Sequence, residues 1–400
     1  MSFENSGGFD RMWADLAPVG RHPGTGGYRR HAWTREDAVL REWFRGEAEQ
    51  RGLEVVGDRA GNLWAWTADP DAGQPGLVLG SHLDSVPDGG AFDGPLGIVS
   101  ALAALDRLDR AAFRRPVGVA CFADEEGARF GVACAGSRLV TGVLDPDRAR
   151  GLTDDDGTTM AEAMTRAGLD PAVVGRDDEA LRRIGTFVEL HVEQGRALVD
   201  RSSAVGVASS IRPHGRWRLD LRGRADHAGT TRLADRQDPM LALAAAVLGA
   251  REAAGRHGAL ATVGKVRVRP NGVNAIPSEV TAWLDARGPD EAGVRQVVAA
   301  VGTAAGADPV EESWTPGTPF EPSLRDRLAG LLGGDGTPAP VLATGAGHDA
   351  GILAAAGIPA AMLFVRNPTG VSHSPAEHAE PDDCAAGVAA LARVVEELAC

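Results

Sequence analysis

The sequence predicts an α/β protein with a sheet flanked by helices and a smaller α+β domain inserted into it. The chain has 400 residues, which is more than one ordinary core accommodates, so two domains are expected. Short apolar runs that end in polar residues alternate with amphipathic helices in both outer parts. The middle part has the order strand, helix, strand, strand, helix, strand, which is typical of the ferredoxin-like fold. We therefore assign 1–209 and 322–400 to a discontinuous larger domain and 210–321 to the inserted domain.

Hydrophobic periodicity identifies the elements of the first outer part. Val39, Trp43 and Phe44 fall on one face of an amphipathic helix, and Thr34 precedes that helix as a suitable N-cap. Short apolar runs bounded by turns are expected to be buried strands. The expected helices are 9–20, 35–51, 96–108 and much of 138–183, and the expected strands are two within 53–66, then 76–80, 116–122 and 184–190.

The inserted domain and the last part of the chain follow the same logic. Residues 216–221 alternate with a period of two, and a Pro-Asn-Gly turn at 270–272 separates two further strands. The inserted domain is expected to hold strands at 216–221, 260–269, 278–287 and 310–315, with helices at 238–255 and 291–305. Beyond it we expect helices at 324–332 and 381–398, a helix that opens at 345–350, and a strand at 360–365.

The composition of the chain indicates which kinds of binding partner and which cellular location to expect. The net charge is −14 at pH 7 and no basic run is present, so nucleic acid is not an expected partner. The 4 cysteines lack the spacing of a zinc ribbon or a disulfide scaffold. No apolar run reaches the length of a membrane span, and the first residues lack the segments of a signal peptide. We expect a cytoplasmic protein with no membrane partner.

Residues of metal-ligating types follow four of the expected strands. Polar clusters beyond the carboxyl ends of buried strands are where open α/β sheets place their ligands. Imidazole together with carboxylate suits a divalent metal such as Zn, Mn, Co or Ni. Of the neighbours Glu125 and Glu126, one can bind metal while the other takes a proton from water. The residues are His82, Asp84 and Asp93 after the first of these strands, Asp124, Glu125 and Glu126 after the second, His191 after the third and His373 after the fourth.

Nine motifs in a fixed order extend this pattern over nearly the whole chain. They lie at 80–86, 92–97, 124–130, 191–195, 227–231, 274–277, 285–287, 347–349 and 372–377. Together they resemble the M20 metallopeptidase family. The Glu-Gln-Gly at 193–195 and the His-Ala-Gly-Thr-Thr at 227–231 are most similar to its amidohydrolase branch, which includes N-carbamoyl-L-amino acid hydrolases, allantoate amidohydrolases and β-ureidopropionases. One departure is Arg232-Leu233, where this branch usually has Pro-Met.

The resemblance implies a zinc-peptidase-like catalytic domain with a mixed central sheet and an inserted lid that also forms a homodimer. It implies two divalent metal ions per subunit (Zn, Mn, Co or Ni), bridged by Asp93. His82 and Glu126 would complete one half of the ligand set, and His191 and His373 the other half. His378 is the rival to His373, which matches the family's Ser-His-x-Pro pattern.

The resemblance also implies roles in catalysis and substrate binding. Glu125 would be the general base, Asp84 would orient the ring of His82, and His227 would reach into the partner's site to polarise the scissile carbonyl. Arg287 would bind the substrate carboxylate with its forked guanidinium. The residues expected to contact substrate are Gln194, Asn274, Arg287, the backbone of Gly370, and His214 as a candidate at the start of the lid.

These expectations describe a binuclear metal-dependent amidohydrolase that hydrolyses the linear ureido (N-carbamoyl) group of small carboxylates and releases ammonia and carbon dioxide. N-carbamoyl-L-amino acids, β-ureidopropionate and allantoate are alternative substrates that the shared motifs do not separate. Another alternative is an N-acyl amino acid deacylase or dipeptidase of the same family, and a more distant one is a binding protein without activity. His348 and Asp349 could either line the pocket or pack beside it at a helix N-terminus.

Overall fold

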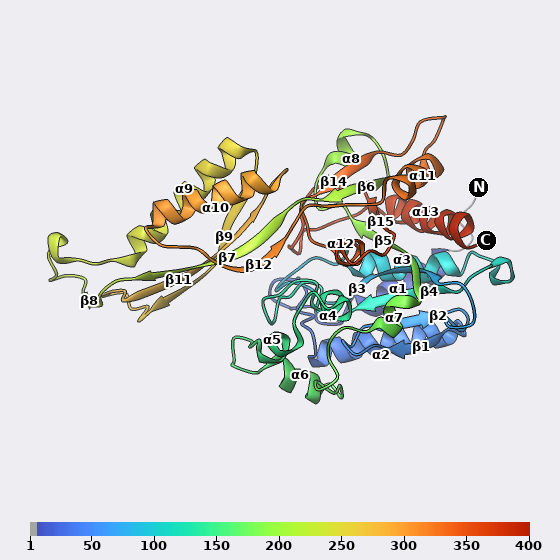
Figure 1. The fold of residues 1–400 in the computed structure, drawn as a ribbon, viewed down its shortest axis with the longest axis horizontal. Helices are drawn as coiled ribbons and strands as arrows, with labels where there is room; N and C mark the ends of the chain where they lie inside the picture. The colour runs from blue at the N-terminus through green and yellow to red at the C-terminus, as the bar shows by residue number, and fades with distance from the viewer. Residues whose placement is uncertain (1–5) are drawn as a thin grey trace. The chain divides into compact units, whose positions relative to one another are not determined.

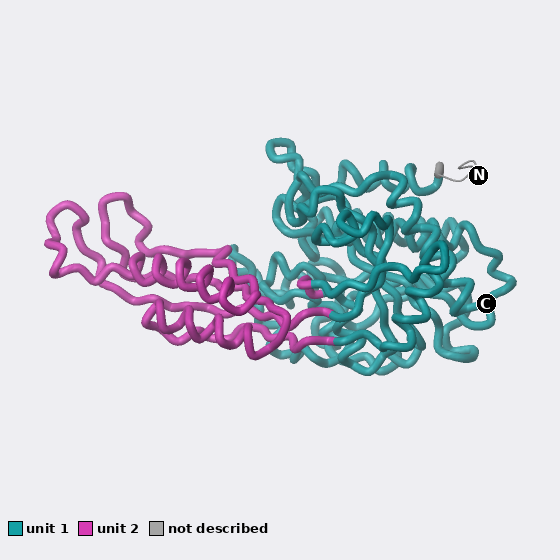
Figure 2. Tube along the Cα trace, turned by 90° about the horizontal axis from the view of Figure 1, so that it is seen from above, with its two compact units in different colours: residues 1–210, 319–344, 348–400 teal, residues 211–318, 345–347 magenta. Residues whose placement is uncertain are grey.

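The computed structural model describes residues 6–400 and divides the chain into two compact units, which Figure 2 colours separately. Unit 1 holds the chain up to residue 210 together with 319–344 and 348–400, and unit 2 holds 211–318. Residues 345–347 also belong to unit 2, although the sequence placed them in the larger domain. The middle of the chain therefore forms a unit of its own, to which a short later segment returns.

Unit 1 is built on a mixed sheet flanked by helices, which confirms the predicted fold class (Figure 1). Over the described residues its nine strands run in the order β1-β2-β4-β3-β5-β15-β6-β13, with β14 paired to β6. Strands β4, β3, β5 and β15 are parallel, whereas β2 and β6 flank them in antiparallel pairings. The carboxyl ends of the four parallel strands therefore lie at one edge of the sheet. The bounds are β1 Glu54–Gly57, β2 Leu63–Trp66, β3 Gly76–His82, β4 Val117–Phe122, β5 Ile184–Val192, β6 Val205–Ile211, β13 Thr318–Pro319, β14 Val341–Thr344 and β15 Ala360–Val365.

Helices cover both faces of this sheet. Because successive side chains of a strand point to opposite faces, Leu190 and Glu189 of β5 mark the two sides. Leu190 lies in the core formed with α3 and α13, and Glu189 accepts the backbone N–H of Ala350 in α12 at 3.1 Å. The helices are α1 Ser6–Leu16, α2 Arg35–Gln50, α3 Pro95–Leu105, α4 Ala135–Thr141, α5 Pro146–Gly151, α6 Met160–Arg166, α7 Asp178–Arg182, α8 Ala197–Asp200, α11 Pro322–Leu332, α12 Asp349–Ala355 and α13 Pro381–Ala399, with a 3₁₀ turn at Arg110–Ala112.

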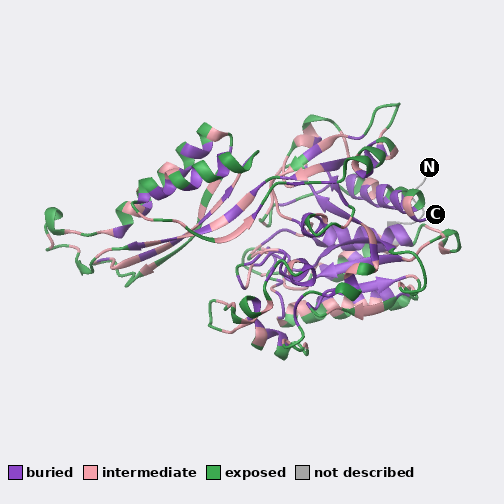
Figure 3. Ribbon diagram, in the orientation of Figure 1, coloured by how far each residue is buried: buried purple, intermediate pink, exposed green. Residues whose placement is uncertain are grey.

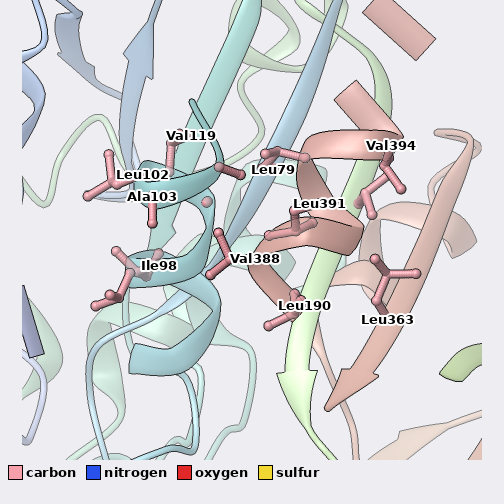
Figure 4. Close-up of a cluster of buried hydrophobic side chains, with 14 of the residues drawn as sticks. Leu79, Ile98, Leu102, Ala103, Val119, Leu190, Leu363, Val388, Leu391 and Val394 are labelled. Carbon is pink, nitrogen blue, oxygen red and sulfur yellow. The ribbon is translucent and has the colours of Figure 1, made fainter. Parts of the chain in front are cut away.

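The largest core fills the space between α3, α13 and the parallel strands. Figure 4 shows Ile98 and Leu102 from α3, Val388, Leu391 and Val394 from α13, and Leu79, Val119, Leu190 and Leu363 from the four parallel strands. All of these side chains are almost completely buried. Burial of a leucine or isoleucine side chain contributes about 1.5–3 kcal/mol, so this core fixes the strands whose ends carry the candidate ligands.

Unit 2 has the ferredoxin-like arrangement expected from its order of elements. Its four-stranded sheet has the order β12-β7-β11-β9 with antiparallel pairings throughout, and α9 and α10 cover one face (Figure 1). Burial alternates along β7 and β11, as expected for strands with one covered face (Figure 3). The bounds are β7 His214–Arg222, β8 Asp226–His227, a 3₁₀ turn Leu233–Asp235, α9 Pro239–His257, β9 Leu260–Arg269, β10 Ala275–Ile276, β11 Glu279–Arg287, α10 Glu291–Ala305 and β12 Val310–Thr315.

Two differences from the expected elements bear on the site. Strands β3 and β5 run further than predicted, so His82 is the last residue of β3 and His191 is the penultimate residue of β5. Both histidines therefore have strand backbone rather than loop backbone. Within the described part of the chain, no helix is both long and apolar enough to cross a membrane.

Candidate functional site

The parallel strands bring the predicted metal ligands of unit 1 together. Two groups of side chains have nitrogen and oxygen atoms that all lie within 4.8 Å of one another: His82, Asp93 and His191, and Asp93, Glu126 and His373. Asp93 belongs to both groups, as a bridging carboxylate would. The grouping differs from the one that the resemblance implied, because His82 lies with His191 and Glu126 lies with His373.

Interatomic distances define the two groups. Asp93 Oδ1 lies 3.0 Å from Nε2 of His191 and 3.5 Å from Nε2 of His82. Its other oxygen, Oδ2, lies 3.5 Å from Nε2 of His373, and the same nitrogen lies 3.5 Å from Oε2 of Glu126. The two oxygens of one carboxylate thus face different histidines, which is the arrangement that a shared ligand of two cations requires.

Backbone carbonyls fix the rings of two of these histidines. Nδ1 of His82 lies 3.1 Å from the carbonyl oxygen of Asp84, and Nδ1 of His191 lies 2.8 Å from that of Val192. Because a carbonyl only accepts, both Nδ1 atoms must donate, so a ring in its neutral form turns the lone pair of Nε2 toward Asp93. Lone pairs that face a carboxylate oxygen repel it unless a proton or a cation lies between them.

Unsatisfied polar atoms support the same interpretation. Among the described residues, Nε2 of His82 and Oε1 of Glu126 are buried without a hydrogen-bond partner. Buried polar atoms almost always have partners, so these two need one. The donor set of three imidazoles and two carboxylates matches the ligands that Zn, Mn, Co and Ni accept. The residues present therefore fit a divalent metal site.

A glycine lets the bridging carboxylate approach its first histidine. Gly94 has φ +84° and a Cβ at this position would lie 2.5 Å from Cε1 of His82. Any other residue would therefore displace the ring, and its backbone would be strained as well. Because Gly94 directly follows Asp93 and precedes α3, this turn sets where the shared carboxylate lies.

Burial shifts the pKa values of the residues in this site. His82, His191 and Asp93 are at most 5% exposed, whereas the side chain of His373 is 51% exposed. Burial alone raises the pKa of Asp93, but His191 and His82 outweigh this effect and hold that pKa well below its usual range. Burial raises the pKa of Glu125 and of Glu126 well above the usual value for a glutamate. A cation bound among these carboxylates would oppose this effect of burial and favour their ionised forms.

The predicted general base lies beside the first group of ligands. Oε2 of Glu125 is 3.7 Å from Nε2 of His82, and its Oε1 accepts from Sγ of Cys134 at 3.5 Å. Asp84, which was expected only to orient His82, also accepts the backbone N–H groups of Glu125 and Glu126. The turn that follows β4 is therefore tied to the end of β3 by this one carboxylate.

Gln194 lies among the candidate ligands. Its Nε2 donates to Oδ2 of Asp93 at 2.8 Å and to Oγ of Ser372 at 3.2 Å. The sequence predicted a substrate contact for this amide, and the structure shows that its donor group is already engaged by the bridging carboxylate. The role toward substrate stays a prediction.

Two residues beside the ligands were not predicted from the sequence, although their motif was noted. Glu377 accepts the backbone N–H groups of Phe92 and Asp93 through Oε1, each at 2.9 Å, and the hydroxyl of Ser372 through Oε2 at 3.1 Å. Oγ of Ser372 also lies 3.2 Å from Oδ2 of Asp93, so its single O–H can donate to only one of the two carboxylates at a time. Glu377 is 5% exposed, and burial raises its pKa to about 7. Its position four residues after His373 was the available signal.

Three further residues of unit 1, considered in the sequence analysis as pocket residues or as a metal ligand, lie near the ligand groups or apart from them. His348 is the residue before α12, and its ring lies 4.5 Å from that of His191. Asp349 is fully buried and accepts from the hydroxyl of Ser137. These two residues therefore form a helix N-terminus packed against a candidate ligand. His378 pairs with the exposed Glu380 at 3.4 Å, and neither group of candidate ligands includes it.

Gly370 makes a loop contact before the last ligand. It has φ +69°, and a Cβ there would lie 2.3 Å from Cγ of Arg196, so the close approach requires glycine. Its N–H donates to Oδ1 of Asn367 at 2.9 Å. Because this amide is engaged, only the carbonyl of Gly370 is left for the backbone contact with substrate that the sequence predicted.

Unit 2 holds the other predicted site residues. His227 and Asn274 lie together, because Ala275 pairs with His227 in the short β8–β10 ladder and the carbonyl of Asn274 accepts the N–H of Ala228 at 2.9 Å. Asp226, which precedes His227, accepts the backbone N–H of His227 at 2.8 Å. That backbone N–H lowers the pKa of Asp226.

A second cluster of unit 2 surrounds Arg287. Its Nε and Nη2 donate to the two oxygens of Asp285 at 2.8 and 2.7 Å, and its Nη1 donates to the carbonyl of Gly345 at 2.9 Å. His214 is paired with Arg287 in the β7–β11 ladder, and Nδ1 of His214 lies 2.9 Å from the carbonyl oxygen of Arg212. The segment 345–347 thus belongs to unit 2 because it meets these side chains.

The chain is similar in sequence and in fold to known proteins. Residues 78–397 match peptidase family M20/M25/M40. It is 36% identical to N-carbamoyl-L-amino acid amidohydrolase of Geobacillus stearothermophilus over 98% of both chains, and 32% identical to allantoate amidohydrolase of Escherichia coli over 96% of both. It is also similar to an amidase of the hydantoinase/carbamoylase family from Burkholderia vietnamiensis, with a TM-score of 0.89 and 30% identity over 98% of this chain and 97% of that one.

Proposed function

The chain belongs to peptidase family M20/M25/M40, and on that premise we propose that it is a metal-dependent amidohydrolase that cleaves linear ureido groups of small carboxylates. The observation that carries the proposal is the carboxylate of Asp93, shared by two groups of candidate ligands. Relatives that are 36% and 32% identical are named for N-carbamoyl-L-amino acids and allantoate, both of which carry a ureido group and a carboxylate.

Two divalent cations would be held by this chain, one by His82, Asp93 and His191 and one by Asp93, Glu126 and His373. When bound, such cations supply a water of lowered pKa and polarise the ureido carbonyl. The metal identity could be Zn, Mn, Co or Ni, because all of them accept imidazole and carboxylate.

Glu125 would move the proton. Its carboxylate lies beside His82 without being a member of either ligand group, which supports a role in taking a proton from the attacking water. It would then give that proton to the leaving nitrogen. Addition of one water releases ammonia and leaves a carbamate, which breaks down to carbon dioxide and the amine.

Unit 2 would hold the substrate. Arg287 would bind the substrate carboxylate, since Asp285 takes only its Nε and Nη2 edge and each Nη atom has a further N–H. His227 would donate to the ureido carbonyl, and Asn274 is fixed beside it. Gln194, Gly370 and His214 would complete the contacts to substrate. These roles rest on the family resemblance and on the clusters described for each unit.

Unit 2 would also form a homodimer. Helix α9 exposes Leu241 and Leu248 at 71% and 70%, and the edge strand β9 exposes Leu260 at 68%. Exposed apolar side chains beside an unpaired sheet edge are typical of a surface that pairs with another chain. A second copy of this chain would cover both features.

Release of ammonia is the direct test. Metal-reconstituted protein is assayed with allantoate and with N-carbamoyl-L-methionine, with a Glu125→Gln variant as the control for contaminating activity. Turnover of either compound supports the proposal, and the preferred compound names the substrate class. Turnover of N-acetyl amino acids or dipeptides alone, with both ureido compounds left intact, would replace it with the deacylase or dipeptidase function. Absence of turnover with metal bound would favour a binding protein.

A further inference from the structure

The loop that follows His227 has little hydrophobic burial to hold it. His227, Gly229 and Thr230 are exposed, and Leu233 is 83% exposed. Since apolar burial normally fixes a segment, the order of this loop must come from polar contacts. Any such contact that fixes the loop also fixes the imidazole at its start.

The backbone amide of Gly229 determines which ring nitrogen of His227 carries the proton. The N–H of Gly229 donates to Nδ1 of His227 at 2.9 Å. Because an amide nitrogen only donates, Nδ1 accepts and the neutral ring carries its proton on Nε2. This is the tautomer that can donate a hydrogen bond to a carbonyl oxygen. Oδ1 of Asp226 accepts the backbone N–H of His227 rather than the ring proton.

Arg236 closes the loop around that amide. Its Nη2 donates to the carbonyl of Ala228 at 2.7 Å and its Nε donates to the carbonyl of Thr231 at 3.1 Å. These two carbonyls lie on either side of Gly229 in the chain. The planar fork of a guanidinium can bind two acceptors at a fixed separation, which an ammonium group cannot reproduce.

The other arginines of this loop make different contacts. Arg232 pairs with Asp235 at 2.6 Å, and its side chain is 82% exposed. Arg224 lies 3.8 Å from the carboxylate of Asp226 and donates to the carbonyl of Asp235. Arg232 thus offers a matched control, because its replacement removes the same charge from the same loop without touching the carbonyls beside Gly229.

We propose that Arg236 is a positioning residue for catalysis, because it holds the loop whose Gly229 amide keeps His227 as an Nε2–H hydrogen-bond donor. The inference rests on the proposed function, which assigns His227 to the scissile carbonyl. In this role Arg236 would determine the tautomer and the orientation of the His227 imidazole without contacting substrate or metal.

The test compares Arg236→Ala and Arg236→Lys with Arg232→Ala in the metal-reconstituted enzyme. Misplacement of a catalytic group by about 1 Å costs up to about 100-fold, so both Arg236 variants should lose about 10–100-fold in kcat with KM changed by less than about threefold. Arg232→Ala should stay within about twofold of the parent. Added guanidinium should restore part of the activity of Arg236→Ala and none of that of Arg236→Lys, whose ammonium still fills the space.

A double-mutant cycle separates positioning from general damage. In a His227→Ala background, Arg236→Ala should lower kcat by less than about twofold further, because the group that it positions is gone. An undiminished loss in that background would overturn the inference. If His227→Ala itself retains full activity, the role of His227 in the proposed function fails, and this outcome is distinct from failure of the role of Arg236.

Imidazole ¹⁵N chemical shifts give a readout that does not depend on activity. In the parent protein, the signals of His227 should show a protonated Nε2 and a free Nδ1. In Arg236→Ala they should move toward the average of both tautomers, and in Arg232→Ala they should not change. An unaltered Nε2–H tautomer in Arg236→Ala would refute the role of Arg236. If Arg236→Ala does not fold, Arg236→Lys carries the same comparison.

Discussion

The carboxylate of Asp84 accepts the backbone N–H of Glu126 at 3.0 Å, and its second oxygen accepts that of Glu125 at 3.2 Å. The family resemblance assigned Asp84 to the ring of His82, and the contact of that ring with the carbonyl of Asp84 at 3.1 Å agrees with such a role. The hydrogen bonds to the two amides add a second role, because they hold the turn that presents the candidate base and a candidate ligand.

Replacement of Asp84 should therefore affect proton transfer and metal binding together. Asp84→Ala leaves two buried amides without an acceptor, which costs about 1–3 kcal/mol each. Loss of a group that supports metal ligands typically costs about 10–100-fold in activity or metal affinity, and we expect that range for kcat. Steady-state kinetics and metal titration check it. Asp71→Asn, at an exposed carboxylate paired with Arg183, is the control; equal losses in both variants would contradict the role of Asp84.

Substitutions of the neighbours Glu125 and Glu126 should have different effects on turnover and on metal content. Glu125→Gln should retain both metals and lose most turnover, because the base is removed while the ligands remain. Glu126→Gln should lose the metal held with His373 first, since one of its ligands becomes a neutral amide. Metal analysis after dialysis, together with ammonia release, distinguishes the two. Loss of metal from Glu125→Gln with full occupancy in Glu126→Gln would reverse the assignment.

Glu377 should act on the metal centre through backbone amides. Glu377→Gln keeps one oxygen for the amides of Phe92 and Asp93, so metal affinity should change by less than about threefold. Glu377→Ala leaves those amides unpaired and should weaken metal affinity by about 10–100-fold. Competition with a metal-sensitive dye measures both values. The exposed Glu380 offers the control variant Glu380→Ala, and a loss there as large as in Glu377→Ala would show that the contacts of Glu377 are not responsible.

Arg287 should control binding of the substrate carboxylate. A charge-assisted hydrogen-bond pair contributes about 1.5–3 kcal/mol, so Arg287→Ala should raise KM by about 10–100-fold. Arg287→Lys should recover little, because an ammonium cannot contact Asp285 and a substrate carboxylate with the same geometry. Arg222→Ala, at an exposed arginine of the same sheet paired with Glu279, should leave KM unchanged. An unchanged KM in Arg287→Ala would move the carboxylate contact to another residue.

Mixing two inactive variants tests the dimer. If His227 serves the site of the partner subunit, a hybrid of His227→Ala and Glu125→Gln subunits contains one complete site. Random mixing makes about half of the dimers hybrid, so about a quarter of the parent activity should return. Each variant mixed with itself is the control. If no activity returns although subunit exchange is confirmed, His227 acts in the site of its own subunit or has no role in catalysis.

The local pattern of the sequence was enough to predict the fold class and the strand ends at which ligands gather. Apolar runs such as 117–122 and 360–365 are fully buried strands because they lie at the centre of a sheet covered on both faces. The order of elements likewise predicted the ferredoxin-like sheet of unit 2, since few topologies accommodate that order. These features follow from short-range periodicity, which a sequence displays directly.

The partners of each polar group were decided only by the tertiary structure. The family resemblance grouped His82 with Glu126, but in the folded chain the ligand atoms of His82 lie within 4.8 Å of those of Asp93 and His191 instead. Glu377 reaches the amide of Asp93 across 284 residues of chain, and the return of 345–347 to unit 2 brings Gly345 to Arg287. Sequence by itself determines which side chains are available and which strand carries each one. The distances between them depend on how distant segments pack, because a hydrogen bond or a shared ligand requires a separation of about 3 Å that no spacing along the chain encodes.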